Sequence, residues 1–264
     1  MDLQLHGKKA LVTGSTGGIG LAIAHKLAQE GATVVVNGRD RDRVEKGVAQ
    51  IRHAVTDASV TGIVADLATA QGAELLIREC PSVDILVNNV GIYDAKAFFE
   101  ITDAEWLRFF ETNVMSGVRL SRAYLPGMLQ RNWGRVVFIS SESAINIPVE
   151  MIHYGMTKTA QLAISRGLAE MTKGTGVTVN SVLPGPTRSE GVEGFVEGLA
   201  QSQGKTPAEV EQDFFAHVRP SSLLQRFATS DEVAAMVAYV CSPLASATNG
   251  AALRVDGGVV RSAF

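Results

Sequence analysis

The sequence contains few of the residues that would indicate a disulfide-bonded or metal-binding protein. Only two of its 264 residues are cysteines, Cys80 and Cys241, and neither belongs to a CxxC motif. Neither has a histidine or a second cysteine at the spacing of a zinc site. Two unpaired cysteines are more typical of the reducing cytosol than of a secreted protein. We therefore expect a cytoplasmic protein with no metal site.

Long apolar runs and an excess of one charge are also lacking. No uninterrupted apolar run approaches the ~18 residues that cross a bilayer. The first residues, MDLQLHGKKALVTG, are unlike a signal peptide. The formal net charge is -3, and lysine and arginine are scattered along the chain. These features predict neither a membrane nor a nucleic-acid partner.

What the sequence does contain is a regular alternation of short β-branched segments with longer amphipathic ones. The expected strands are 8–13, 33–36, 60–64, 84–87, 135–139, 177–183 and 252–255, and the expected helices include 18–29, 41–55, 103–130, 152–173 and 231–241. This alternation predicts a single α/β domain, residues 1–264, with helices on both faces of a parallel sheet. It breaks only at residues 188–226, where we expect a substrate lid with two short helices.

The first expected strand leads directly into a glycine-rich turn. Residues 13–20 read TGSTGGIG, and a helix follows. Glycine lets the backbone approach a ligand, and the free N–H groups of a helix N-terminus bind an anion. This is the arrangement of a dinucleotide diphosphate site, although the spacing of Gly14 and Gly18 differs from GxGxxG. A glycine turn without a ligand is the alternative. A P-loop is excluded, because no Lys-Ser/Thr follows.

The end of the second expected strand bears on which dinucleotide binds. Residues 37–40 read NGRD. An acidic residue here would bind the ribose 2′-hydroxyl of NAD, whereas an arginine accommodates the 2′-phosphate of NADP. Arg39 therefore predicts a preference for NADP(H). Asp40 could instead pair with Arg39 or Arg43, so NAD(H) is the alternative.

Tyr154 and Lys158 are four residues apart on an expected helix and share a face. A phenol has a reference pKa of ~10, and a cation one turn away favours its ionised form. Tyr154 could then give a proton to a forming alkoxide or take one from an alcohol. Ser141 follows the strand 135–139, at the edge where α/β sheets bind ligands, and could hold a substrate carbonyl.

In this order along the chain, these motifs resemble those of the short-chain dehydrogenase/reductases, with 3-oxoacyl-[acyl-carrier-protein] reductases as the similar members. TGSTGGIG resembles the family's TGxxxGxG motif, NNVG at 88–91 its NNAG motif, PGPT at 184–187 its nicotinamide-binding segment, and DGG at 256–258 its C-terminal motif. There are two departures. Val90 replaces the usual alanine of NNAG, and residues 142–144 read ESA where many members have a glycine.

The resemblance implies a role for individual residues. Asn113, Ser141, Tyr154 and Lys158 would form a catalytic tetrad, in which Asn113 orders a water, Ser141 polarises the carbonyl, Tyr154 is the acid/base and Lys158 lowers the pKa of Tyr154 and holds the ribose. The cofactor-binding residues would be Gly14, Ser15, Thr16, Gly18, Ile19, Gly20, Arg39, Asp66, Leu67, Asn89, Gly91, Tyr154, Lys158, Pro184, Gly185 and Thr187. The resemblance also implies a Rossmann-type, doubly wound sheet of about seven parallel strands and a homotetramer.

We therefore expect an NADP(H)-preferring oxidoreductase that interconverts a ketone or aldehyde with an alcohol by hydride transfer. One alternative is an NAD(H)-dependent polyol or sugar dehydrogenase of the same fold. Another is a non-catalytic NADP(H)-binding sensor or scaffold, which the presence of all four catalytic residue types disfavours. A serine hydrolase would need a GxSxG elbow, which neither Ser140 nor Ser141 provides.

The substrate is left open among a 3-oxoacyl thioester, a sugar or polyol, a steroid-like alcohol and a xenobiotic ketone. We expect the pocket between residues 92–99, 144–153 and 185–220, which supply many apolar side chains. If these face the ligand, the pocket is partly apolar. The alternative is that most of the phenylalanines pack the lid against the core. Three acidic residues could lie near its mouth and would disfavour a strongly anionic substrate, or they could be solvated surface residues. These are Glu142, Glu150 and Glu190.

Overall fold

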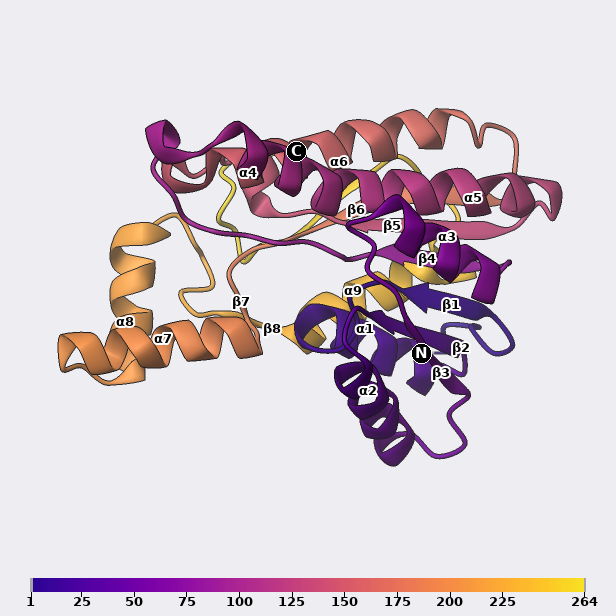
Figure 1. Cartoon of the computed structure of the whole chain (residues 1–264), viewed down its shortest axis with the longest axis horizontal. Coiled ribbons are helices and arrows are strands. Elements are labelled where there is room, and N and C mark those ends of the chain that lie inside the picture. Colours follow the sequence, from indigo (N-terminus) through magenta and orange to yellow (C-terminus); the bar gives the residue numbers. More distant parts are fainter. Residues whose placement is uncertain (1, 264) are drawn as a thin grey trace.

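Among the described residues, seven strands form one parallel sheet in the order β3-β2-β1-β4-β5-β6-β9 (Figure 1). The computed structural model describes residues 2–263, apart from the side chains of Glu190 and Phe195. The strands are β1 (Lys9–Val12), β2 (Thr33–Gly38), β3 (Val60–Val64), β4 (Ile85–Asn88), β5 (Gly134–Ile139), β6 (Val177–Pro184) and β9 (Ala252–Val255). All neighbours are parallel, which confirms the expected doubly wound sheet. The strand order reverses between β1 and β4, and such switch points bind ligands.

Helices cover both faces of the sheet (Figure 1). One face packs against α1 (Gly18–Gln29), α2 (Arg41–Ala54) and α9 (Ser230–Cys241), and the other against α3 (Ala70–Glu79), α5 (Ser116–Gln130) and α6 (Ile152–Glu170). Successive side chains of a strand point to opposite faces. Accordingly, Ala10 and Val12 of β1 join the first apolar core, whereas Leu11 joins the second.

The expected helix 103–130 is divided in the structure. α4 (Asp103–Phe110) begins at Thr102, whose side chain forms a reciprocal capping box with Glu105. A π-helical turn, Glu111–Met115, then precedes α5. In a π turn the main chain pairs with the fifth residue along instead of the fourth, and such turns are frequent at functional sites. The turn contains Asn113.

The segment between β6 and α9 forms a unit beside the sheet. It contains α7 (Glu190–Gln203), α8 (Pro207–Asp213) and a second π-helical turn, Phe214–Val218. The two short helices expected within residues 188–226 are thus confirmed. Figure 1 shows them, in orange, standing beside the sheet. Two short parallel strands, β7 (Thr187–Arg188) and β8 (Ala228–Thr229), flank the segment.

This segment has an apolar core of its own. Its buried members are Val196, Ala200, Val210, Phe215 and Phe227. The ring of Phe227 stacks on that of Phe214 at a centroid distance of 5.1 Å. We call residues 189–227 the lid segment. None of the described helices, in the lid segment or elsewhere, is both long and apolar enough to cross a membrane.

Candidate active site

A cavity of about 1220 Å³ opens at the carboxyl ends of β1, β4, β5 and β6, against the lid segment. Ten of the residues predicted from the sequence line it: Gly18, Ile19, Asn89, Gly91, Ser141, Tyr154, Lys158, Pro184, Gly185 and Thr187. The other predicted residues lie behind or beside this cavity. They are Gly14, Ser15, Thr16, Gly20, Arg39, Asp66, Leu67 and Asn113.

The glycine-rich turn brings main-chain atoms to this cavity. Gly14 and Gly18 have φ angles of +59° and +53°, which favour glycine. A side chain at Gly20 would place its Cβ 2.5 Å from the Gly14 carbonyl oxygen. No described side chain caps the N-terminus of α1, so its first N–H groups are available to an anion. A closely approached backbone and a free helix N-terminus fit a dinucleotide diphosphate.

Neighbouring side chains hold this turn from behind. The Asn89 amide donates to the carbonyls of Thr13 and Gly14, at 2.9 and 3.1 Å. The Ser15 hydroxyl donates to the Val12 carbonyl at 2.6 Å and accepts from the Asn37 N–H at 3.0 Å. Ser15 is fully buried, so its side chain supports the turn rather than facing a ligand.

The end of β2 leaves no room for an acidic side chain. A Cβ at Gly38 would lie 2.5 Å from Cγ2 of Thr16. Arg39 is exposed, and its side chain has no hydrogen bond or ion pair with any residue that the structure describes. Asp40 instead accepts from the Arg43 N–H at 2.9 Å and caps α2. Pairing of Asp40 with Arg39 is therefore not seen, and the guanidinium of Arg39 is free to bind an anion.

Asp66 and Leu67, which follow β3, differ in their exposure. Asp66 is exposed, and its carboxylate accepts a hydrogen bond from the Ala68 N–H at 3.1 Å. Leu67 is 2% exposed and packs in the apolar core. A ligand at this edge can therefore reach the carboxylate of Asp66, whereas Leu67 offers it only main-chain atoms.

The two serines after β5 have different partners. The Ser140 hydroxyl donates to the Lys158 carbonyl at 2.9 Å. Ser141 starts the short 3₁₀ turn Glu142–Ala144, and its Oγ accepts from the Ser143 N–H at 3.1 Å. A hydroxyl that accepts this bond keeps its own hydrogen for a ligand carbonyl. The geometry therefore favours Ser141 over Ser140 as the group that binds a carbonyl.

Tyr154 and Lys158 lie one turn apart on α6, with Nζ of Lys158 5.6 Å from the centroid of the Tyr154 ring. Burial raises the pKa of Tyr154 to about 12, although its hydrogen bond with Ser141 acts in the opposite direction. Burial lowers the pKa of Lys158 to about 7. The expected lowering of the Tyr154 pKa by Lys158 is not seen, because loss of hydration dominates both groups. The phenol of Tyr154 is thus protonated at neutral pH.

Asn113 links the loop after β4 to α6. Its side chain accepts from the Ile92 N–H at 2.8 Å and donates to the Ile92 carbonyl at 2.9 Å and to the Thr157 hydroxyl at 3.0 Å. The main-chain carbonyl of Asn113, in the π turn, accepts a hydrogen bond from Nε2 of Gln161 at 2.6 Å. Oε1 of Gln161 in turn accepts from Nζ of Lys158 at 3.4 Å. Sequence patterns did not indicate Gln161.

The family of the chain follows from comparison with known proteins. The family model described as short chain dehydrogenase matches residues 8–199. The chain belongs to the short-chain dehydrogenase/reductase family. It is an oxidoreductase of that family, which confirms the resemblance seen in the sequence.

Among the relatives of this dehydrogenase/reductase is the uncharacterized oxidoreductase YvaG of Bacillus subtilis, 50% identical over 100% of both chains. The 3-oxoacyl-[acyl-carrier-protein] reductase FabG of Aquifex aeolicus is 32% identical over 98% of this chain and 100% of the relative. A solved structure of L-sorbose reductase from Gluconobacter frateurii, complexed with NADPH and L-sorbose, superposes with a TM-score of 0.94. It is 30% identical and covers 99% of this chain and 100% of that one.

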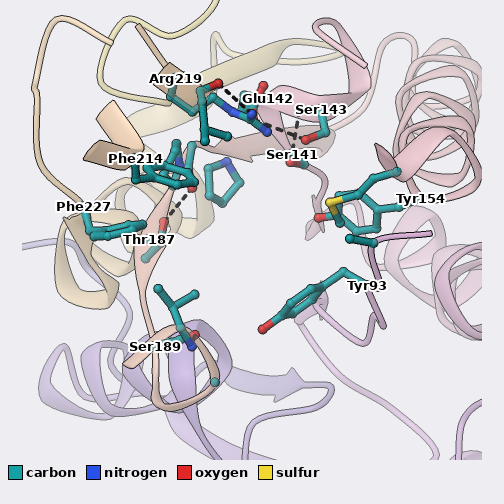
Figure 2. A pocket seen from close by; sticks show the side chains of 18 of the residues that line it. Tyr93, Ser141, Glu142, Ser143, Tyr154, Thr187, Ser189, Phe214, Arg219 and Phe227 are labelled. Carbon is teal, nitrogen blue, oxygen red and sulfur yellow. Dashed lines mark hydrogen bonds and ion pairs between the residues drawn. The ribbon is translucent and has the colours of Figure 1, made fainter. Parts of the chain in front are cut away.

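The lid segment supplies much of the wall of this dehydrogenase/reductase cavity (Figure 2). Its apolar lining residues include Val192, Val196, Leu199, Phe214 and Phe227. Tyr93, from the loop after β4, lies edge-on to Tyr154 with ring centroids 6.4 Å apart. Its hydroxyl approaches the lid segment so closely that a Cβ at Gly191 would be 2.9 Å away. The pocket is therefore partly apolar, as the sequence predicted.

Two of the three acidic residues expected near the mouth also line the cavity, Glu142 and Glu150. The side chain of Glu190 lies outside the described residues. Among the residues that the structure describes, no group of three or more His, Cys, Asp or Glu side chains could hold a metal ion.

Proposed function

We propose that this dehydrogenase/reductase is an NADP(H)-preferring enzyme that interconverts a ketone or aldehyde with an alcohol, with Tyr154 as the acid/base. One observation carries the proposal. Ser141, Tyr154 and Lys158 line one cavity with the glycine turn, and Asn113 is tied to the same helix turn. This set provides a hydrogen-bond donor for a carbonyl oxygen, a phenol proton and a buried lysine amine next to the glycine turn.

Each of these side chains has a distinct task in the proposed reaction. NADPH, when bound, supplies the hydride. The Ser141 O–H donates to the substrate carbonyl oxygen, and the Tyr154 O–H gives the alkoxide its proton. Burial raises the pKa of Tyr154 to about 12, so the phenol holds this proton at neutral pH until the alkoxide forms. Lys158 would hold the ribose, and Asn113 fixes the turn of α6 that carries Tyr154.

The cofactor preference rests on the end of β2. Arg39 is free to bind a 2′-phosphate, and Thr16 fills the space that an acidic side chain at Gly38 would need. The alternative of an NAD(H)-dependent polyol or sugar dehydrogenase lacks the acidic residue that would bind the ribose 2′-hydroxyl. A non-catalytic sensor is disfavoured because all four catalytic side chains are present and buried or in the cavity.

Three further features belong to the same proposal. The lid segment would close over the substrate, because its apolar side chains line the cavity. A homotetramer is supported by exposed apolar side chains around α4, among them Phe98, Leu107 and Phe99, which is 97% exposed. Light scattering would measure the assembly. The free thiols of Cys80 and Cys241 support a cytoplasmic location.

The test is a titration with NADPH and NADH, followed by a carbonyl panel read by loss of NADPH absorbance. We expect tighter binding of NADPH and turnover of one class of carbonyl compound. Tyr154→Phe should bind NADPH like the unmodified protein and lose turnover. Undiminished turnover in that variant would refute the role of Tyr154, and binding of neither cofactor would refute the whole proposal.

A further inference from the structure

The cavity wall beside Ser141 carries a buried ion pair. Nε of Arg219, at the end of the second π turn, donates to Oε1 of Glu142 at 3.0 Å, and the two side chains are 14% and 4% exposed. The Ser143 hydroxyl donates to the same oxygen at 3.3 Å. Figure 2 shows this group next to Ser141, on the opposite side of the cavity from Tyr93. The pair thus joins the lid segment to the loop that carries Ser141.

One edge of the Arg219 guanidinium is open to a ligand. Nη1 donates to the Val218 carbonyl at 3.1 Å. Nη2 has no hydrogen-bond partner within residues 2–263 as far as their side chains are described. Nη2 is not fully buried, unlike the polar atoms that lack a partner in the interior, and Arg219 lines the cavity. Nη2 is therefore an accessible donor in the wall of the site.

The Arg219–Glu142 pair as a whole presents no net charge to the cavity, because the carboxylate balances the charged guanidinium. Burial raises the pKa of the Glu142 carboxyl, Arg219 acts against this rise, and nearby Asp256 adds to it. Glu150 is a further acidic residue of the lining. A guanidinium N–H paired in this way still donates a hydrogen bond. It does not supply the uncompensated positive charge that would offset the desolvation of an anion.

We propose that Arg219 binds a second oxygen atom of the substrate, and that this oxygen belongs to a neutral hydroxyl or carbonyl group rather than to a carboxylate. The inference rests on the proposed function and narrows its substrate class. A hydroxyketone of the sugar type and a 3-oxoacyl ester share this chemistry. A simple alkyl ketone lacks it, and a keto acid carries the wrong charge.

Four methyl ketones test the proposal: 2-pentanone, 4-hydroxy-2-butanone, ethyl acetoacetate and acetoacetate. With NADPH, kcat/KM for at least one neutral oxygenated ketone should exceed that for 2-pentanone by about tenfold or more, as expected for a hydrogen bond from a charged donor. Acetoacetate should have the lowest kcat/KM of the three oxygenated ketones. The hydroxyl and ester arms distinguish a sugar-like substrate from an acyl one.

Two variants assign the preference to the ion pair. Arg219→Met should abolish the advantage of the oxygenated ketone over 2-pentanone. Glu142→Gln leaves Arg219 uncompensated and should raise acetoacetate relative to the neutral ketones. Glu150→Gln removes the same charge from another part of the lining and is the matched control. Melting temperatures of all variants show whether each one folds.

If the ratios of kcat/KM among the four ketones are the same in the unmodified protein, in Arg219→Met and in Glu142→Gln, the inference is overturned and the proposed function is left intact. A preference of the unmodified protein for acetoacetate would have the same consequence. If NADPH binds and none of the four ketones is reduced, the inference about the substrate class is overturned, whereas the proposed function fails only if no member of the wider carbonyl panel is reduced.

A second inference concerns Lys158 and comes from a different observation. Its Nζ donates to the Ile139 carbonyl at 2.8 Å and to Oε1 of Gln161 at 3.4 Å, while Gln161 donates to the Asn113 carbonyl at 2.6 Å. Gln161 is 2% exposed. We infer that Gln161 is a positioning residue whose side-chain amide links Lys158 to the main-chain carbonyl of Asn113. The family resemblance led us to expect a water at Asn113.

The prediction is a change in the titration of Lys158. Gln161 offers a carbonyl oxygen to the ammonium group, so its removal should lower the pKa of Lys158 below the present value of about 7. A carboxylate at the same place should raise it. Tyr154 is the titratable side chain in contact with Lys158 among the described residues, and it stays neutral in this range.

NMR of protein labelled at the lysine side chains measures this titration without any substrate. Lys158→Met assigns the signal. The midpoint should move down in Gln161→Leu and up in Gln161→Glu, whereas a merely structural role would not move it in opposite directions. Gln161→Met, which keeps the side-chain length, replaces the leucine variant if that one does not fold. An unchanged midpoint in these variants would overturn the inference, whatever the outcome of the activity assays.

Discussion

Replacing Arg39 with alanine should weaken the binding of NADPH and leave that of NADH almost unchanged. A hydrogen bond to a charged group contributes about 1.5–3 kcal/mol. Arg39 is exposed, so solvent and salt screen it and the lower end of this range applies. A loss of about 1.5 kcal/mol raises the Kd for NADPH about tenfold. Because Arg39 has no partner among the described residues, the free energy of unfolding should change by less than about 0.5 kcal/mol.

Calorimetric titrations of the unmodified protein and of Arg39→Ala with NADPH and with NADH measure this difference in Kd. Arg41→Ala is the matched control, since Arg41 is also exposed and already faces Glu45 at 3.8 Å. Raising the salt concentration should reduce the advantage of NADPH in the unmodified protein and have little effect in Arg39→Ala. Equal losses for NADPH and NADH, or an equal loss in the control, would refute a contact between Arg39 and the 2′-phosphate.

The remaining predictions concern the supports of the site. Gly38→Asp should lower the melting temperature, because its Cβ overlaps the methyl group of Thr16, and adding Thr16→Ala should restore it; no recovery would contradict the overlap. Asn113→Ala removes three hydrogen bonds and should lower the free energy of unfolding by about 2–4 kcal/mol, measured with urea. A smaller decrease would contradict a supporting role for these bonds. Phe227→Ala should make the lid segment more sensitive to protease with little change in the unfolding of the sheet. Joint unfolding of both parts would count against an independent core.

Local patterns in the sequence were enough to predict the sheet and the edge at which the site lies. Strands rich in valine and isoleucine alternate with helices, and the glycine turn follows β1 directly. Since parallel strands end at one edge of the sheet, the sequence alone predicts that Ser141 lies close to the residues after β6. Their common cavity agrees with that reasoning.

Contacts between distant segments could not be predicted in the same way. Gln161 meets Asn113 across 48 positions of the chain, and Arg219 meets Glu142 across 77. Neither pair follows a helical or strand period, so no spacing rule indicates it. The π turn at Asn113 was missed because its sequence, ETNVM, has no glycine or proline to interrupt a helix. The direction of the Tyr154 pKa also depends on burial, which only the packed structure shows.

The parallel pairing of β7 with β8 has a consequence for how such proteins diversify. Thr187 pairs with Ala228, so the two ends of the lid segment lie side by side, and the segment brings its own apolar core. Chain insertions succeed where the ends are close and few contacts are disturbed. The lid segment can therefore be replaced or lengthened with little disturbance of the main sheet. Under the proposed function, we expect a change of substrate to require changes in this segment and few changes in the residues that the sheet carries.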